Sequence, residues 1–321
     1  MAYYAFGEVV KYLLNPEHMP QPIIVVGSSN TDMVIKAAKF PLPGETILGG
    51  EFFLFPGGKG ANQAVAAARL GGNVIFIAKV GNDIFGEQAL QQFKREGIIT
   101  DYVAKDPDRP SGVALITVDS KGENTIAVAQ GSNGALSSDD VQKAESEFEK
   151  SDIVLTQLET PLQTILHVAK LVGKFQKRLI LNPAPGMKLP DDLFPSLYLI
   201  TPNESETEVL TGISVRDNSS IKRAAEKLKE MGVANVIITL GSEGAYLYND
   251  AGGKHIPTKK VKAIDTTAAG DVFNGALAVA LSENRTLEQA AEFANHAAAI
   301  SVTKMGAQAS APYRKELMNN L

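Results

Sequence analysis

An aspartate that follows three small residues could support phosphoryl transfer. Residues 265–275 read Asp-Thr-Thr-Ala-Ala-Gly-Asp-Val-Phe-Asn-Gly. The small residues 268–270 let the backbone turn closely, and the apolar residues that follow recur at helical spacing, so Asp271 is predicted on the first turn of a helix. A helix start favours an anion such as phosphate, and a nearby aspartate can take a proton from an attacking hydroxyl. The segment predicts an anion site beside a general base.

A second glycine-rich loop precedes another predicted helix. Residues 55–63 read Phe-Pro-Gly-Gly-Lys-Gly-Ala-Asn-Gln and lead into an alanine-rich stretch that reaches Leu70. This is no Walker A loop, because the glycine spacing before Lys59 is wrong and no Ser or Thr follows it; no Gly-x-Gly-x-x-Gly follows the first predicted strand either. A glycine turn before a packed helix explains the segment alone equally well. Lys59 and Asn62 favour a functional interpretation.

Polar side chains follow the first predicted strand. Residues 27–32 read Gly-Ser-Ser-Asn-Thr-Asp. In an extended segment Asn30 and Asp32 point the same way, so they could hold neighbouring hydroxyls of a sugar. An Asx-type turn is the alternative, and in isolation it is favoured.

Further polar groups follow other predicted strands at the same sheet edge. Residues 157–159, with Glu159, and residues 201–206 each follow a predicted strand, and ligands usually bind at the carboxyl edge of such a sheet. Carboxylates there suit Mg²⁺. Residues 203–206 are also typical of a helix cap with acidic first-turn residues, and both interpretations can hold together. The glycines of residues 239–244 could cradle nucleotide phosphates, although such turns are common.

Composition narrows the functional classes. The chain has 321 residues, is 44% hydrophobic and carries a net charge of -5, so it can bury a large core and has no electrostatic footprint for nucleic acid or an anionic membrane surface. The absence of cysteine excludes disulfides, thiolate metal sites and a cysteine nucleophile, and it agrees with a cytoplasmic protein. No apolar stretch approaches the roughly 18 residues that span a bilayer. The four histidines lack metal-ligand spacing.

The apolar pattern predicts an α/β fold with a doubly wound parallel sheet. Short β-branched runs, most of them followed by helical stretches, occupy residues 23–26, 74–78, 153–155, 179–181, 197–200 and 236–240. Two other segments, residues 31–56 and about 111–131, alternate like exposed antiparallel strands, and we expect them to form a small β-sheet lid. Residues 1–21 are interpreted as an added or upstream extension, and residues 22–321 as the domain.

These motifs together resemble the ribokinase family of sugar kinases. The resemblance is carried by Gly-Gly-Lys-Gly-Ala-Asn at residues 57–62, Asn203-x-x-Glu206 and Asp-Thr-x-Ala-Ala-Gly-Asp at residues 265–271. Residues 27–32, 182–185 and 306–310 match the family as well, and the resemblance extends from about residue 22 to the C-terminus. It implies a Rossmann-like, ribokinase-like fold with a lid. Ala268 stands where glycine is common in the wider family.

The resemblance also implies roles for individual residues. Asp271 would be the base, with an anion hole formed by the N–H groups of Ala268, Ala269 and Gly270. The sugar would be held by Asn30, Asp32, Gly58, Lys59, Asn62, Glu159 and Asp271, with Ala114 as apolar cover. ATP would lie along Asn203, Thr239, Gly241, Ser242 and Gly244, with Asn295 near the adenine, and Glu206 would hold Mg²⁺ through water. An activating K⁺ would be bound at Asp265, Thr267, Ser301, Lys304, Gly306 and Ser310, several of them through backbone carbonyls.

The expected activity is ATP-dependent phosphorylation of D-ribose at its 5-hydroxyl, with stimulation by K⁺. A sibling kinase for deoxyribose, fructose or a nucleoside is the first alternative, and a sugar-binding protein without turnover is the second. Exposed strand edges on the lid would be a pairing hazard unless another subunit covers them, so we expect a homodimer clasped through the lid.

Overall fold

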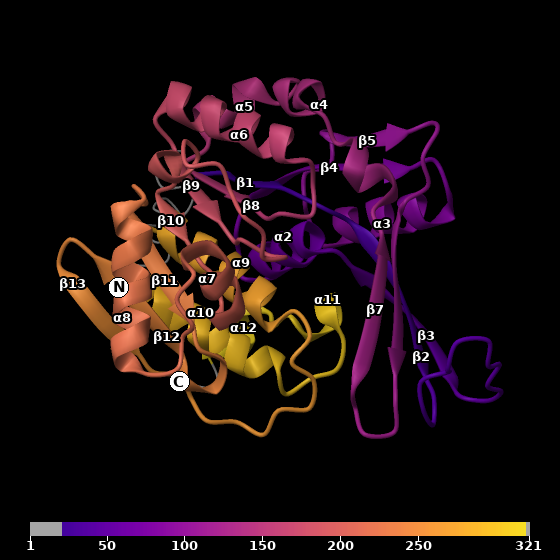
Figure 1. The fold of residues 1–321 in the computed structure, drawn as a ribbon. Coiled ribbons are helices and arrows are strands. Elements are labelled where there is room, and N and C mark those ends of the chain that lie inside the picture. The colour runs from indigo at the N-terminus through magenta and orange to yellow at the C-terminus, as the bar shows by residue number, and fades with distance from the viewer. Residues whose placement is uncertain (1–20, 319–321) are drawn as a thin grey trace, which may run out of the picture.

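The main domain is built on a nine-stranded sheet. A computed structural model describes residues 21–318 of the chain. The strand order is β13-β12-β11-β10-β9-β8-β1-β4-β5, and every pairing from β11 to β5 is parallel, whereas β12 and β13 are added antiparallel at one edge (Figure 1). The strands are β1 Ile23–Val26, β4 Val74–Gly81, β5 Val103–Asp106, β8 Ile153–Thr156, β9 Arg178–Leu181, β10 Leu199–Ile200, β11 Asn235–Thr239, β12 Ala245–Asn249 and β13 Gly252–Ile256. All six predicted strands are confirmed.

Successive residues of one strand belong to two separate cores, one on each face of the sheet. Ile23 and Val25 pack into the first core, whereas Ile24 and Val26 pack into the second. The first core is covered by α2 Lys59–Arg69, α3 Ile84–Arg95, α9 Ala269–Ser282, α10 Leu287–Ser301 and α12 Arg314–Met318. The second is covered by α4 Ser138–Gln142, α5 Glu145–Lys150, α6 Leu162–Phe175, α7 Glu204–Thr211 and α8 Asn218–Glu230. Burial on both faces explains the continuous apolar runs and confirms the doubly wound fold.

Helix α9 is buried along its length. Every residue from Asp271 to Ser282 is buried, as expected for a helix that is apolar all round, and its main partners are α10 and α2. At the crossing with α2, a Cβ on Gly275 would lie 2.7 Å from the carbonyl oxygen of Gln63. This close approach sets the start of α9 against the start of α2.

The lid is a separate four-stranded sheet in the order β3-β2-β6-β7, standing beside the main domain (Figure 1). Its strands are β2 Asn30–Lys36, β3 Glu51–Gly57, β6 Gly112–Val118 and β7 Asn124–Ala129. The predicted small sheet is confirmed, and its role as a lid stays a prediction. An antiparallel arrangement throughout is wrong, because β2 and β6 pair in parallel. The chain crosses the main domain between β3 and β6, so no hairpin turn forces those two segments to run in opposite directions.

Two sequence-based expectations concern the limits of the chain and membrane spans. The proposed extension at residues 1–21 lies, apart from Gln21, outside the described residues. Among the helices of residues 21–318, none has the length and apolar character needed to cross a membrane.

Candidate active site

The site lies where the carboxyl ends of β1 and β8 meet the N-termini of α2 and α9. The loop before α2 is pressed against the end of β1, because the N–H of Ala61 donates to the carbonyl oxygen of Ser28 at 2.8 Å. A Cβ on Gly60 would lie 2.5 Å from the Ser28 nitrogen, so only glycine allows this approach. Gly58 caps α2 with a φ of 88°, which also favours glycine. The glycine-rich loop therefore brings Lys59 to the edge of the sheet.

Asp271 is held by two side chains of α2. It lies on the first turn of α9 and is 6% exposed. Its Oδ2 accepts a hydrogen bond from Asn62 Nδ2 at 2.9 Å, and its Oδ1 accepts one from Gln63 Nε2 at 3.0 Å. Burial raises the pKa of Asp271, and the charge of Lys59 with these two amide donors opposes that rise. The two hydrogen bonds fix the orientation of the carboxylate, and its raised pKa makes it a better proton acceptor.

Buried amides behind Asp271 fix those donors. Gln63 Nε2 also donates to Asn182 Oδ1 at 3.0 Å, and Gln157 Nε2 donates to Gln63 Oε1 at 2.6 Å. On the other side, Thr201 Oγ1 donates to Asn274 Oδ1 at 2.6 Å, and Asn274 Nδ2 donates to the Gly270 carbonyl at 2.8 Å. This network connects the ends of three strands to the start of α9.

The start of α9 presents free N–H groups. Ala268 adopts a left-handed conformation with a φ of 60°. The first hydrogen bond of the helix is donated by the Val272 N–H to the Ala268 carbonyl oxygen at 2.9 Å. Within residues 21–318, the N–H groups of Ala268, Gly270 and Asp271 have no acceptor, whereas that of Ala269 contacts the Thr266 carbonyl at 3.3 Å. These donors could bind an anion.

The predicted sugar ligands come together at the base of the lid. Asp32 and Ala114 are register partners on β2 and β6. Asn30 Oδ1 accepts a hydrogen bond from Asn133 Nδ2 at 2.7 Å. Glu159 Oε2 accepts from Ser28 Oγ at 2.5 Å and from the Lys59 N–H at 3.0 Å, so the end of β8 is tied to the start of α2.

Four carboxylates surround one ammonium group. Burial lowers the pKa of Lys59, but Asp271, Glu159, Glu206 and Asp32 together raise it above its usual value, so the ammonium stays charged. Burial, with the nearby Glu159 and Asp271, raises the pKa of Asp32 to about 6. A site with this excess of carboxylates suits hydroxyl groups, which donate hydrogen bonds, and it suits cations.

One cavity of about 180 Å³ joins the predicted catalytic residues to part of the predicted ATP site. Its lining includes Lys59 and residues 268–271 from the predicted catalytic set, and Asn203, Glu206 and Thr239 from the predicted ATP site. Asn203 and Glu206 form a capping box at the start of α7, as the sequence suggested, with the Asn203 N–H donating to Glu206 Oε2 at 2.9 Å. Burial raises the pKa of Glu206.

The remaining predicted nucleotide residues lie farther along the same sheet edge. Gly241 and Ser242 form a short 3-10 helix after β11, η4 Gly241–Glu243, and Gly244 ends it with a φ of 93°. Asn295 lies on α10, and its Nδ2 donates a hydrogen bond to the Ile256 carbonyl at 2.9 Å. It is not among the residues that line the 180 Å³ cavity. Its contact with adenine stays a prediction.

The predicted cation residues bring two loops together. Asp265 Oδ1 accepts from the Thr267 N–H at 2.9 Å and its Oδ2 from the Gly306 N–H at 2.8 Å. Although burial opposes it, these hydrogen bonds lower the pKa of Asp265, so the carboxylate is ionised. The Ser301 and Ser310 hydroxyls donate to backbone carbonyls, and Lys304 Nζ contacts Glu316 at 2.6 Å. Lys304 could therefore offer a cation only its carbonyl.

Comparison with known proteins identifies the family. Residues 21–314 match the pfkB family of carbohydrate kinases. The chain belongs to this family. It is 43% identical to a ribokinase of Haemophilus influenzae over 94% of this chain and 99% of the relative, and 38% identical to a deoxyribokinase of Salmonella typhi over 90% and 95%. The solved structure of Arabidopsis thaliana ribokinase, complexed with ribose and ATP, is 32% identical, has a TM-score of 0.87 and covers 94% of this chain and 98% of that chain.

Several polar residues of this kinase have site contacts that sequence reasoning did not assign. Gln63, Gln157, Asn182 and Asn274 form the amide network, and Asn133 contacts Asn30. All of them are buried. A glutamine or asparagine directly after a buried strand, as at positions 157 and 182, is a signal that could have found two of them.

Proposed function

We propose that this kinase transfers the γ-phosphoryl group of ATP to the 5-hydroxyl of D-ribose. The observation that carries the proposal is the 180 Å³ cavity in which Asp271 lies beside free N–H groups and beside Lys59, whose ammonium interacts with the predicted sugar ligands Asp32 and Glu159. Ribokinases at about 40% identity over nearly the whole chain support ribose as the acceptor.

Asp271 acts as the general base in this proposal. One carboxylate oxygen accepts the proton of the 5-hydroxyl as the oxygen attacks the γ-phosphorus; the new O–P bond forms while the bond to the β,γ-bridging oxygen breaks and ADP leaves. The N–H groups of Ala268 and Gly270, together with the charged Lys59, stabilise negative charge on the transferring group. The amides of Asn62 and Gln63 keep the base in position.

Unsatisfied polar atoms suit a polyhydroxylated acceptor. Asn62 Oδ1 is buried without a hydrogen-bond partner in the described chain, so a sugar hydroxyl can donate to it. Asp32 and Glu159 lie close enough to Lys59 for their charges to act on its ammonium group, and Asn30 begins the strand that carries Asp32. Closure of the lid, with Ala114 as apolar cover, would exclude water from the reaction.

Cations complete the proposal. Within residues 21–318 no cluster of three acidic or histidine side chains could hold a metal alone. A lone Glu206 at the cavity fits Mg²⁺ that keeps its waters and bridges ATP phosphates, where it would neutralise phosphate charge. The ionised Asp265 joins the loops that contain Thr267 and Gly306, and backbone carbonyls of these loops together with its negative charge suit K⁺. We also propose a cytoplasmic location, because the chain lacks cysteine.

An acceptor-specificity assay tests the proposal. Deoxyribose is the second candidate, because a deoxyribokinase is 38% identical over 90% of this chain. Among ribose, 2-deoxyribose, fructose and a nucleoside, we expect kcat/KM, measured by coupled ADP release, to be highest for D-ribose. In the proposal, Asp32 and its neighbours accept hydrogen bonds from the hydroxyls of ribose, and an acceptor that lacks one of these hydroxyls leaves a site group unpaired. A higher value for 2-deoxyribose would assign the enzyme to the second candidate, and no ADP release with any sugar would reject both.

A further inference from the structure

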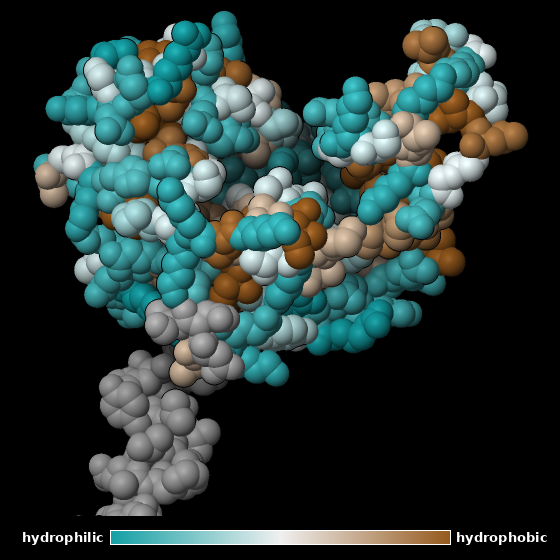
Figure 2. Space-filling model, turned by 90° about the horizontal axis from the view of Figure 1, so that it is seen from below, coloured by the Kyte–Doolittle hydropathy of each residue, from teal (hydrophilic) through white to brown (hydrophobic). Residues whose placement is uncertain are grey.

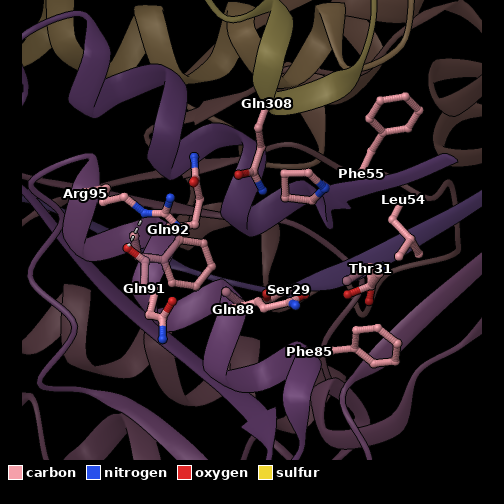
Figure 3. Close-up of a pocket in the computed structure, with 14 residues that line it drawn as sticks. Ser29, Thr31, Leu54, Phe55, Phe85, Gln88, Gln91, Gln92, Arg95 and Gln308 are labelled. Carbon is pink, nitrogen blue, oxygen red and sulfur yellow. Dashed lines mark hydrogen bonds between the residues drawn. The ribbon is translucent and has the colours of Figure 1, made fainter.

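A second pocket lies outside the active site, between α3, the base of the lid and α11 Ala307–Ser310. It has a volume of about 410 Å³, within the range of small-molecule sites. We call it the α3 pocket; its main lining residues are Ser29, Thr31, Phe85, Gln88, Arg95 and Gln308. Figure 3 shows Gln308 extending into it from α11 above Ser29, opposite the side chains of α3.

One buried polar atom of the α3 pocket has no partner in the described chain. Gln308 is 1% exposed, and its Oε1 has no hydrogen bond within residues 21–318. A buried amide oxygen without a donor is costly, so a ligand hydroxyl that donates to it would be stabilised. The backbone N–H and carbonyl of Ser29 are both bonded to the Asn133 side chain, and the Ser29 hydroxyl is a second polar group of the pocket wall.

The opposite wall carries an unpaired positive charge. Phe85, Gln88, Gln92 and Arg95 are spaced three, four and three residues apart, so they share one face of α3. Arg95 Nε donates to the Gln91 carbonyl at 3.3 Å, but no carboxylate of residues 21–318 lies within ion-pair distance of the guanidinium. None of the residues lining the pocket is acidic. A guanidinium in this setting suits a phosphate group, which it can bind through two hydrogen bonds.

We propose that the α3 pocket binds a sugar phosphate. The phosphate pairs with Arg95, the amides of α3 contact the sugar ring, and the hydroxyls reach Gln308 and Ser29. The choice of ligand rests on the proposed function, because a pentose phosphate is the product of that reaction. Ser29 and Thr31 flank Asn30, so the pocket adjoins the strand that contributes to the acceptor site.

Calorimetry on the blocked enzyme tests this site. Ribose 5-phosphate is titrated into enzyme saturated with D-ribose, Mg²⁺ and a non-hydrolysable ATP analogue, so that the active site is filled. We expect one further molecule to bind, and Arg95→Gln to weaken it by about tenfold or more. The control is Lys94→Gln, which removes the same charge from the same helix outside the pocket and is expected to change the affinity less than twofold.

A second variant separates binding from folding. Gln308→Met keeps the side-chain length, removes the unsatisfied Oε1 and leaves the backbone carbonyl that accepts from Arg69 Nη1 at 2.6 Å. We expect it to keep the melting temperature and to lose affinity for ribose 5-phosphate. Unchanged affinity in this variant, no binding to the blocked wild type, or equal losses for Arg95→Gln and Lys94→Gln would each overturn the proposal.

Inorganic phosphate examines the ligand class. It is expected to bind to the blocked enzyme more weakly than ribose 5-phosphate; equal affinity for inorganic phosphate would reject the sugar phosphate. If the acceptor assay identifies a different sugar, the active site is blocked with that sugar instead. Arg95-dependent binding would then support the α3 pocket although the proposed acceptor had failed.

Discussion

Asp271 is buried and accepts hydrogen bonds from two amide side chains. These two features determine its pKa and its orientation, and so its suitability as a general base. Burial raises its pKa, which makes the carboxylate a better proton acceptor, while Asn62 and Gln63 prevent it from rotating away. The acid and its supports come from helices that are about 200 residues apart in sequence, as the separation of 209 between Asn62 and Asp271 shows.

Replacing this carboxylate should stop turnover and spare binding. Asp271→Asn preserves size and one of the two accepted hydrogen bonds but cannot accept the proton, so we expect kcat to fall about a thousandfold while ribose affinity changes a few-fold. Coupled ADP release measures the first quantity, and calorimetry with ribose measures the second. Asp250→Asn, whose side chain is 95% exposed, is the control and should keep wild-type kcat. Near-normal turnover in Asp271→Asn would show that another group is the base.

Asp32 should make stability depend on pH. Its folded pKa of about 6 exceeds the ordinary value of 3.8, so the folded protein holds the proton more tightly than the unfolded chain. Ionisation therefore destabilises the fold. Asp32→Asn should gain nothing below pH 3.8, gain stability as pH rises to 6, and keep a constant advantage of about 3 kcal/mol above it.

Thermal melts at pH 3.5, 5 and 7.5 check this prediction. The exposed Asp191→Asn is the control and should give no pH-dependent gain. A gain of equal size at all three values would mean that the charge of Asp32 is not the cause. The same variant should raise the KM for ribose, because it removes the carboxylate that we propose accepts hydrogen bonds from the sugar hydroxyls.

At the scale of elements, α2 and α9 must cross closely enough for Gln63 to reach Asp271. Gly275→Ala would place a Cβ 2.7 Å from the Gln63 carbonyl and 2.8 Å from the Ala66 Cβ, so the helices must separate. We expect a loss of about 1–3 kcal/mol in the free energy of unfolding and a fall in kcat.

The matched control is another helical glycine with open surroundings. Gly173, on α6, has no atom within 4 Å of an added Cβ, so Gly173→Ala should be neutral or stabilise by up to about 1 kcal/mol. Urea denaturation measures both variants. Equal effects at the two positions would show that helix propensity, and not the α2–α9 contact, decides the outcome.

The two loops joined by Asp265 should control the response to K⁺. Asp265→Asn removes the charge beside the Gly306 and Thr267 N–H groups, so we expect the ratio of kcat with and without K⁺ to fall towards one. Lys304→Met is the control within the same region, because its ammonium contacts Glu316 and only its carbonyl is proposed to face the cation. Loss of K⁺ stimulation in Lys304→Met alone would contradict the assignment.

Strands with a continuous apolar pattern could be predicted from the sequence. Side-chain contacts between residues that are distant in sequence could not. Buried parallel strands such as β1 read as unbroken β-branched runs, whereas β13 is largely exposed, contains two glycines and carries no such run. The loops at residues 55–63 and 265–271 were recognisable because each precedes a predicted helix. The contacts of Gln157 and Asn182 were not predictable, because both residues bond to Gln63, which lies 94 and 119 residues away from them.

The whole molecule exposes an apolar lid. Figure 2 shows the lid as an arm beside a hollow in the surface, with hydrophobic residues along it. Leu54 and Leu115 are 50% and 57% exposed, and both pair in register with Met33 and so share one face of the sheet. Ile126, on the face that carries Asp32, is 56% exposed. Apolar surface on both faces, with β3 and β7 as open edges, is typical of a sheet that another subunit covers.

We therefore expect a homodimer that assembles through the lid. Light scattering coupled to size exclusion should give twice the chain mass of 34.2 kDa. Leu115→Glu combined with Ile126→Glu places a charge on each face of the lid, so it should give monomers whichever face is covered. Ile84→Glu, at a 63% exposed position on α3, is the control and should remain dimeric. A wild type of monomer mass at every concentration would reject the lid as an interface, and a dimeric double variant would locate the contact elsewhere on the main domain.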